Sequence, residues 1–283
     1  HPFTNPNSCI NMVGGKVSIL TGATVPISAT ITACATGATS LIAGHLLLEQ
    51  GRADVAICGA VDFCLVEPIV AGFATMNGAY QPKPGHPPLP PEQASRPFSI
   101  DRRGFVIAEG AACLIATTET FARRYGLSPD IALAGWSMTS DAKHFVAPNL
   151  DTVTRCMTEA IADAGLQPSD VAAVNAHGTS TRIGDTVEAR ALEQVFGQHL
   201  PPVSANKSMT GHAMGASSAI ETILAIEGMQ RGLVLPTINH VPDPDLPLDV
   251  VAEGTRALDQ SFVLKNAFGF GGCNSCIVLH RQS

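Results

Sequence analysis

A cysteine and a histidine occupy equivalent places in two similar stretches of this 283-residue chain. The stretch that begins at Cys34 is Cys-Ala-Thr-Gly-Ala-Thr-Ser, and the stretch that begins at His212 is His-Ala-Met-Gly-Ala-Ser-Ser. The same offset of 178 residues also places Leu46 on Leu224. Self-similarity of this kind indicates an internal duplication. If the two copies pack face to face, Cys34 and His212 meet in one pocket.

Cys34 lies between two patterns that predict regular structure. Residues 25–32 are mostly β-branched and predict a buried strand, whereas the apolar spacing of residues 38–50 predicts a helix. The unpaired backbone N–H groups at a helix N-terminus favour a thiolate and can hold an oxyanion, so we expect Cys34 to be a nucleophile. The alternative is an inert core cysteine, and the position alone leaves both open.

A second histidine, His177, follows the predicted strand 171–175. Catalytic groups gather at the carboxyl ends of strands in α/β sheets, so this position favours a functional histidine over a structural one. Lys207 precedes His212 by five residues, and a lysine close to two histidines disfavours their protonated forms. We therefore expect two neutral imidazoles beside Cys34.

The remaining elements must position these side chains. Residues 54–60 predict a buried parallel strand, 104–117 a strand hairpin, and the proline-rich stretch 80–95 a surface loop. Strands that alternate with helices indicate an α/β fold with a central sheet. Further strands are predicted near 131–136, 171–175, 203, 234–235, 262–267 and 275–279, and helices at 119–126, 151–164, 186–196 and 215–230. The chain before them is predicted to be a loop followed by a helical or irregular stretch around 11–16.

Four spaced motifs resemble those of the elongating β-ketoacyl-acyl carrier protein synthases, which have the thiolase fold. The motifs are Thr32-Ala33-Cys34, Asn175-Ala176-His177-Gly178-Thr179-Ser180-Thr181, Lys207-Ser208-Met209-Thr210-Gly211-His212 and Phe268-Gly269-Phe270-Gly271-Gly272-Cys273-Asn274. The segments 94–98 and 101–105 also match the family. The resemblance covers essentially the whole chain, in order.

The resemblance implies two related α/β halves in a layered αβαβα arrangement. Residues 1–126 would be the C-terminal portion of the first thiolase-like half, which carries the nucleophile, and residues 127–283 would be the second half, with the histidines and the glycine-rich loop. The elements at 131–196 have no counterpart before Cys34. We therefore expect that the N-terminal part of the first half is missing from this chain and that an N-terminal segment of the same protein completes it.

The resemblance also assigns roles to individual residues. Cys34 resembles the nucleophile that takes an acyl group from a carrier-protein thioester. His177 and His212 resemble the pair that supports decarboxylation of the malonyl extender. The backbone N–H groups of Cys34 and Phe270 would form the oxyanion hole, and Phe270 would also be a gate. The supporting residues would be Lys207 and Glu221, which fix the histidines, together with Asp185 and Asn274.

The implied function is decarboxylative Claisen condensation in fatty acid or polyketide chain elongation. The alternative is a non-catalytic, chain-length-determining subunit of a ketosynthase heterodimer, although such subunits lack the nucleophile. Thiolases use a second cysteine as acid and base, and initiation-type synthases use histidine with asparagine, so both fit less well. Cys273, in place of a common threonine, and a long proline-rich loop are departures that favour a polyketide or polyene intermediate.

The implied substrates are carried on the phosphopantetheine of an acyl carrier protein, with no cofactor and no metal. The implied assembly is a homodimer or a ketosynthase heterodimer. Carrier proteins are usually acidic, and this chain has a formal net charge of −7, so docking needs a local basic patch. Arg102, Arg103 and Lys143 are the candidates.

Composition excludes several other classes of protein. The chain is 45% hydrophobic and only 14% charged, which is typical of a compact α/β protein. Its negative charge and few aromatic residues argue against a nucleic-acid surface, and no apolar run has membrane-spanning length. The eight cysteines lie mostly in apolar runs, and Cys273 and Cys276 have no second pair for zinc, so we expect reduced thiols and a cytoplasmic protein.

Overall fold

The larger sheet has five strands and lies at the centre of the molecule. The computed structural model describes residues 9–282, so any structure predicted for residues 1–8 lies outside the described residues. β8 pairs antiparallel with β9 and parallel with β4. The strand order is β3 (Ile131–Ser140), β9 (Cys273–Arg281), β8 (Phe262–Gly269), β4 (Ala173–Asn175) and β5 (Val203–Ser204).

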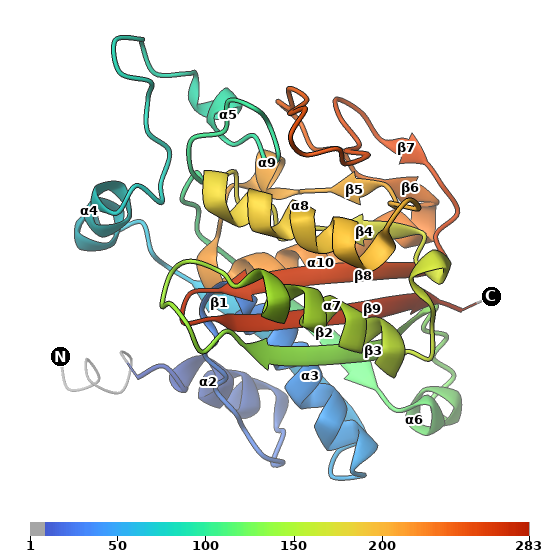
Figure 1. Ribbon diagram of the computed structural model, residues 1–283. Coiled ribbons are helices and arrows are strands. Elements are labelled where there is room, and N and C mark those ends of the chain that lie inside the picture. The colour runs from blue at the N-terminus through green and yellow to red at the C-terminus, as the bar shows by residue number, and fades with distance from the viewer. Residues whose placement is uncertain (1–8, 283) are drawn as a thin grey trace, which may run out of the picture.

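Helices cover both faces of this sheet (Figure 1). Cys276 and Val278 of β9 pack into the core cluster of α7 (Leu150–Asp163) and α8 (Arg182–Phe196). The alternate residues Ile277 and Leu279 pack against α3 (Thr36–Glu49) and α10 (Met214–Arg231). Because side chains alternate between the faces of a strand, the two helix pairs lie on opposite sides of the sheet.

A two-stranded antiparallel sheet lies beyond α3 and α10. It consists of β1 (Val55–Asp62) and β2 (Gly110–Thr117), and both strands contact both helices. The described residues therefore form four successive layers, α, β, α and β. On the outer face of the small sheet, Ile57 and Ile115 are exposed, Ile115 by 72% of its surface.

The duplicated stretches meet where α3 crosses α10. Gly37 of α3 lies so close to Ala219 that an added Cβ would stand 2.3 Å from the Ala219 backbone nitrogen. The Ala38 N–H donates to the Ser218 hydroxyl at 3.1 Å. The small residues repeated in both copies thus allow the two helix N-termini to approach, as the face-to-face packing requires.

Three predicted elements are wrong. Residues 25–32 form no strand. None of the described strands pairs with them, and Val25, Ile27 and Ile31 are exposed. β1 pairs antiparallel with β2 and is half-buried, so the predicted parallel strand is wrong. Residues 104–117 form no hairpin, because only β2 is a strand.

The segment before β2 instead holds the backbone of the second histidine. The His212 N–H donates to the Val106 carbonyl at 2.7 Å, and the Ala108 N–H donates to the His212 carbonyl at 2.9 Å. These bonds fix the position of His212 from a second part of the chain.

The other predicted helices and strands are present within a few residues of their expected bounds, whereas the predicted loop 80–95 contains the short helix α5 (Pro91–Ala94). Within residues 9–282, no helix has the length and hydrophobicity needed to cross a bilayer. The remaining elements are α2 (Met12–Thr21), η1 (Ala33–Ala35), α4 (Glu67–Thr75), α5 (Pro91–Ala94), α6 (Glu119–Arg124), η2 (Pro168–Asp170), α9 (Lys207–Thr210), β6 (Leu233–Val234) and β7 (Arg256–Ala257).

Candidate active site

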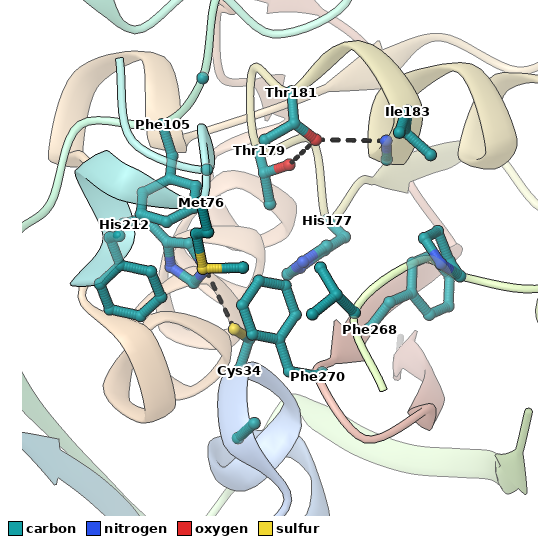
Figure 2. A pocket seen from close by; sticks show the side chains of 18 of the residues that line it. Cys34, Met76, Phe105, His177, Thr179, Thr181, Ile183, His212, Phe268 and Phe270 are labelled. Carbon is teal, nitrogen blue, oxygen red and sulfur yellow. Dashed lines mark hydrogen bonds between the residues drawn. The ribbon is translucent and has the colours of Figure 1, made fainter. Parts of the chain in front are cut away.

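Cys34 and His212 are in direct contact (Figure 2). The Cys34 Sγ lies 3.1 Å from Nε2 of His212, and Nδ1 of His212 lies 2.9 Å from the Ser217 hydroxyl. Cys34 sits in the 3-10 turn η1, which leads directly into α3. The residues before the two side chains, Ala33 and Gly211, have positive φ angles of 49° and 69°. A residue with positive φ thus precedes each reactive group.

His177 completes a cluster of three reactive side chains. It follows β4, and its ring lies edge-to-face with the ring of His212, with the centroids 5.8 Å apart. Glu188 of α8 accepts hydrogen bonds from the backbone N–H groups of His177 and Gly178, both at 2.8 Å. The carboxylate thus fixes the loop that presents His177 to the pocket.

Lys207 is held between a carboxylate and His177. Its Nζ donates to Oε1 of Glu221 and to the His177 carbonyl, both at 2.6 Å, and lies 3.4 Å from Nδ1 of His177. An ammonium group only donates hydrogen bonds, so Nδ1 faces it as an acceptor. The proton of the neutral ring is then on Nε2.

A second buried lysine, Lys265 of β8, was not predicted from the sequence. Its Nζ donates to Oε2 of Glu221 at 2.8 Å and to the Asn266 carbonyl. Glu221 therefore bridges two ammonium groups, Lys207 and Lys265. The signal for Lys265 was a lysine in the middle of a mostly apolar strand, a position where an unpaired charge is rarely tolerated.

Both imidazoles are uncharged at neutral pH. Burial lowers the pKa of His177 well below its ordinary value, and the positive charges of Lys207 and Lys265 lower it further. Burial is also the main cause that lowers the pKa of His212, followed by the same two lysines. The sequence predicted the neutral rings but attributed them to Lys207, which is the second cause.

Cys34 is a thiol in the resting site, contrary to the predicted thiolate. Burial raises the pKa of Cys34 to about 11, which outweighs the lowering by Lys207 and by the backbone N–H groups of Phe270 and of Cys34 itself. Those two N–H groups point at the sulfur. Nucleophilic attack therefore requires a proton acceptor, and the nearest described one is His212.

The loop between β8 and β9 forms the wall beside Cys34. At Gly269 an added Cβ would stand 2.3 Å from the Thr32 carbonyl oxygen, so only glycine lets this loop approach the nucleophile. The ring of the next residue, Phe270, lies 6.3 Å from that of Phe73. The Gly271 N–H donates to the Phe145 carbonyl at 2.7 Å, which ties the loop to residues 144–148.

A cavity of about 760 Å³ connects these groups to the surface. Cys34, His177, His212 and Phe270 all line it, and so do apolar side chains from α4. Its size suits an extended organic substrate. Within the described residues, no cluster of His, Cys, Asp or Glu side chains has the geometry of a metal site.

The other two predicted supporting residues have different places. Asn274 lines the cavity, and its Nδ2 donates to Asp141 at 2.7 Å. Asp185 lies behind the site, where it accepts from the backbone N–H groups of Phe98 at 2.7 Å and Thr179 at 2.9 Å. Burial raises the pKa of Asp185 to about 7 despite these donors. Asp185 thus fixes the loop after His177 one residue further along than Glu188 does, at Thr179.

The predicted docking residues do not form one patch. Arg102 is buried, donates to Asp243 at 2.7 Å and to the Thr186 hydroxyl at 2.8 Å, and is therefore no docking residue. Arg103 is half-buried and lines the cavity, whereas Lys143 is exposed beside it. Cys273 and Cys276 are three residues apart on β9, so their side chains leave opposite faces of the strand.

The arrangement combines a protonated cysteine nucleophile with two neutral imidazoles that can donate hydrogen bonds. A thiol beside an imidazole can accept an acyl group, and two backbone N–H groups can hold the oxyanion that forms. Two neutral imidazoles can donate to a second developing oxyanion. This set suits carbon–carbon bond formation on an acyl thioester.

Comparison with known proteins gives consistent matches. The family profile of the beta-ketoacyl synthase N-terminal domain matches residues 1–121, and that of the C-terminal domain matches residues 131–241. The 3-oxoacyl-[acyl-carrier-protein] synthase 2 of Staphylococcus aureus is 37% identical over 286 residues, which cover 99% of this chain and 67% of the relative. The protein of the same name from Coxiella burnetii is 36% identical over 285 residues, covering 99% and 68%.

Solved structures agree with these matches. A type II polyketide ketosynthase, in complex with its acyl-carrier protein and bound to the hexaketide, has a TM-score of 0.95 and 30% identity, covering 100% of this chain and 70% of that one. The ishigamide ketosynthase/chain length factor has a TM-score of 0.90 and 31% identity, covering 97% and 66%. These likenesses confirm the predicted fold, and the chain spans about two thirds of the length of its relatives.

Proposed function

Because the chain belongs to the β-ketoacyl synthase family, we propose that it condenses an acyl group held on Cys34 with a malonyl group carried by an acyl carrier protein. The observation that carries the proposal is the contact between the Cys34 sulfur and Nε2 of His212 at 3.1 Å, inside a cavity that His177 also lines. The same contact disfavours the non-catalytic subunit.

In the first half-reaction the Cys34 sulfur attacks the carbonyl carbon of the incoming thioester. The thiol proton passes to His212, and the N–H groups of Cys34 and Phe270 donate to the oxyanion. A carbon–sulfur bond to Cys34 forms, the bond to the carrier thiol breaks, and that thiol leaves with the proton.

In the second half-reaction the malonyl group loses carbon dioxide. The electron pair of the broken carbon–carbon bond forms an enolate, whose oxygen accepts hydrogen bonds from the Nε2–H groups of His177 and His212. For this step the proton of the neutral His212 ring moves from Nδ1 to Nε2. The enolate carbon attacks the acyl carbonyl, a new carbon–carbon bond forms and the carbon–sulfur bond to Cys34 breaks. The Cys34 sulfur leaves as a thiolate and takes up a proton from solvent. Lys207 and Glu221 hold His177 in place, Asp185 fixes its loop, and Asn274 positions the loop beside the cavity.

The proposed surroundings of the reaction follow from the family. The substrates are bound to the phosphopantetheine of an acyl carrier protein, no further cofactor takes part, and the enzyme is a dimer, either of two identical subunits or of a ketosynthase and a chain-length subunit. We also propose residues 1–126 and 127–283 as its two units and the cytoplasm as its location. The matches to an N-terminal and a C-terminal family domain support the division.

The test is to follow the acyl group on the protein. Wild-type protein incubated with an acyl-carrier protein should gain one acyl group on the Cys34 peptide by mass spectrometry. Cys34→Ala should gain none and should form no condensation product, while it still releases carbon dioxide from malonyl-carrier protein. The matched control Cys113→Ala alters an exposed cysteine on β2 and should behave as wild type. An acyl group on another cysteine would overturn the assignment.

A further inference from the structure

Lys265 is a buried cation that the condensation chemistry above does not use. It lies in the middle of β8, is 0% exposed, and pairs in parallel register with Asn175, two residues before His177. Burying an ammonium group costs several kcal/mol unless it is paired, so a lysine here needs a reason. A methionine or leucine would fill the same place in a strand without that cost.

The partner of Lys265 is already engaged. Glu221 receives Lys207 on Oε1 at 2.6 Å and Lys265 on Oε2 at 2.8 Å, so one carboxylate balances two ammonium groups. These three side chains therefore carry one excess positive charge, and the second carboxylate that interacts with Lys265 is Glu188 of α8. Lys207 and Glu221 would balance each other's charge without Lys265, so Lys265 is not needed to complete their ion pair.

The excess charge faces the two imidazoles. Lys207 contacts Nδ1 and the carbonyl of His177, and the rings of His177 and His212 are in edge-to-face contact. The charged and titratable groups packed around these rings and Lys265 are Cys34 of η1, Glu188 of α8, Lys207 of α9, Glu221 of α10 and Cys276 of β9. Cys34 is a neutral thiol at rest, and Glu188 is held by three N–H donors.

We propose that Lys265 is a positioning residue of this site, whose buried positive charge holds the two active-site imidazoles in the uncharged state. This role rests on the proposed function, since only neutral imidazoles allow His212 to accept the thiol proton and both rings to donate to the enolate. In agreement, the charge of Lys265 lowers the pKa of both His177 and His212, after burial and Lys207.

The first experiment titrates the imidazoles directly and needs no substrate. Full-length protein carrying ¹³C-labelled histidine is titrated by NMR as wild type and as Lys265→Met. Removing one nearby positive charge should raise the pH at which His177 and His212 protonate by about one unit, which means about tenfold more imidazolium at a given acidic pH. Unchanged titration of both rings in the folded variant overturns the proposal.

Two further variants separate charge from structure. Lys265→Gln keeps a hydrogen-bond donor toward Glu221 but no charge, so it should shift the titration as Lys265→Met does; wild-type titration would show that only the hydrogen bond matters. The double variant Lys265→Met with Glu221→Gln removes one positive and one negative charge, so its rings should titrate near the wild-type pH. If Lys265→Met fails to fold, these two variants test the charge of Lys265 in its place.

The second experiment measures carbon dioxide release from malonyl-carrier protein as a function of pH. The acid limb of this profile should move to higher pH in Lys265→Met and return in the double variant. If wild-type protein releases no carbon dioxide at any pH, the proposed function fails, while the NMR titration still decides the role of Lys265. An acid limb that does not follow the NMR titration would overturn the link between imidazole charge and decarboxylation.

Discussion

At the scale of single residues, the two histidines are held by different partners. Lys207 fixes the ring of His177 through Nδ1, whereas Ser217 and Cys34 contact the two nitrogens of His212. In the proposed reaction, His212 therefore both accepts the Cys34 proton and donates to the enolate. His177 is placed only for the second task.

This difference predicts unequal effects of alanine substitution. His177→Ala and His212→Ala should each slow carbon dioxide release by about two to four orders of magnitude, because each removes an N–H donor from the developing oxyanion. Acylation of Cys34 should be slowed mainly in His212→Ala. Stopped-flow acylation and carbon dioxide release measure the two steps separately. The exposed His199, which is remote from the cavity lining, provides the control His199→Ala.

The sequence predicted the residues that recognisable motifs carry, but not those that join the site only through the fold. Cys34 and His212 were placed together by the duplication. Lys265 was missed because its partner Glu221 is 44 residues away and a lone charged residue in a strand pattern has no obvious role. Glu188 was missed although it lies three residues after Asp185, on the same face of α8.

At the scale of elements, the site depends on how closely α3 and α10 approach. Gly37→Ala should push the helices apart, because its Cβ has no room beside the backbone of Ala219. Overpacking of this kind costs about 1–3 kcal/mol, and it should also separate Cys34 from His212. Calorimetry should show a lower Tm, and Cys34 acylation should be slower.

Gly15 offers a matched control on another helix. It lies in α2, where an added Cβ meets nothing within 4 Å. Gly15→Ala should keep or slightly raise the Tm, since alanine is the better helix former. If Gly15→Ala lowers the Tm as much as Gly37→Ala does, the loss of stability in Gly37→Ala is not caused by the close crossing of α3 and α10.

Periodicity predicted most helices and central strands because their burial follows from local spacing. The pairing of strands was harder to predict from the sequence, since it depends on neighbours that are distant in the chain. Residues 25–32 have strand-forming side chains but no described strand beside them, and β1 has an apolar sequence but only one covered face. Propensity alone distinguishes neither case.

At the scale of the whole molecule, this acidic protein must bind an acyl carrier protein that we also expect to be acidic. The net charge of −7 repels such a partner, so local positive charges near the cavity entrance carry the attraction. Lys143 is exposed and adjoins His144, which lines the cavity.

Lys143→Glu should therefore raise the KM for malonyl-carrier protein by about two- to fivefold, the range of an exposed charge pair. The effect should decrease at high ionic strength because salt screens exposed charges. Lys16→Glu makes the same change on the exposed Lys16 of α2, which does not line the cavity, and should leave KM unchanged. Equal effects of the two substitutions would indicate a response to net charge alone.

The cluster of Lys207, Glu221 and Lys265 has a consequence for protein engineering. Buried ion pairs are often less stabilising than apolar residues of similar volume, so replacing the cluster with well-packed hydrophobic residues would favour the folded state. Selection of variants for heat resistance alone would then remove these charges early, and with them the chemistry. A thermostable version of this protein is better sought on the exposed loops, with the cluster held fixed throughout the search.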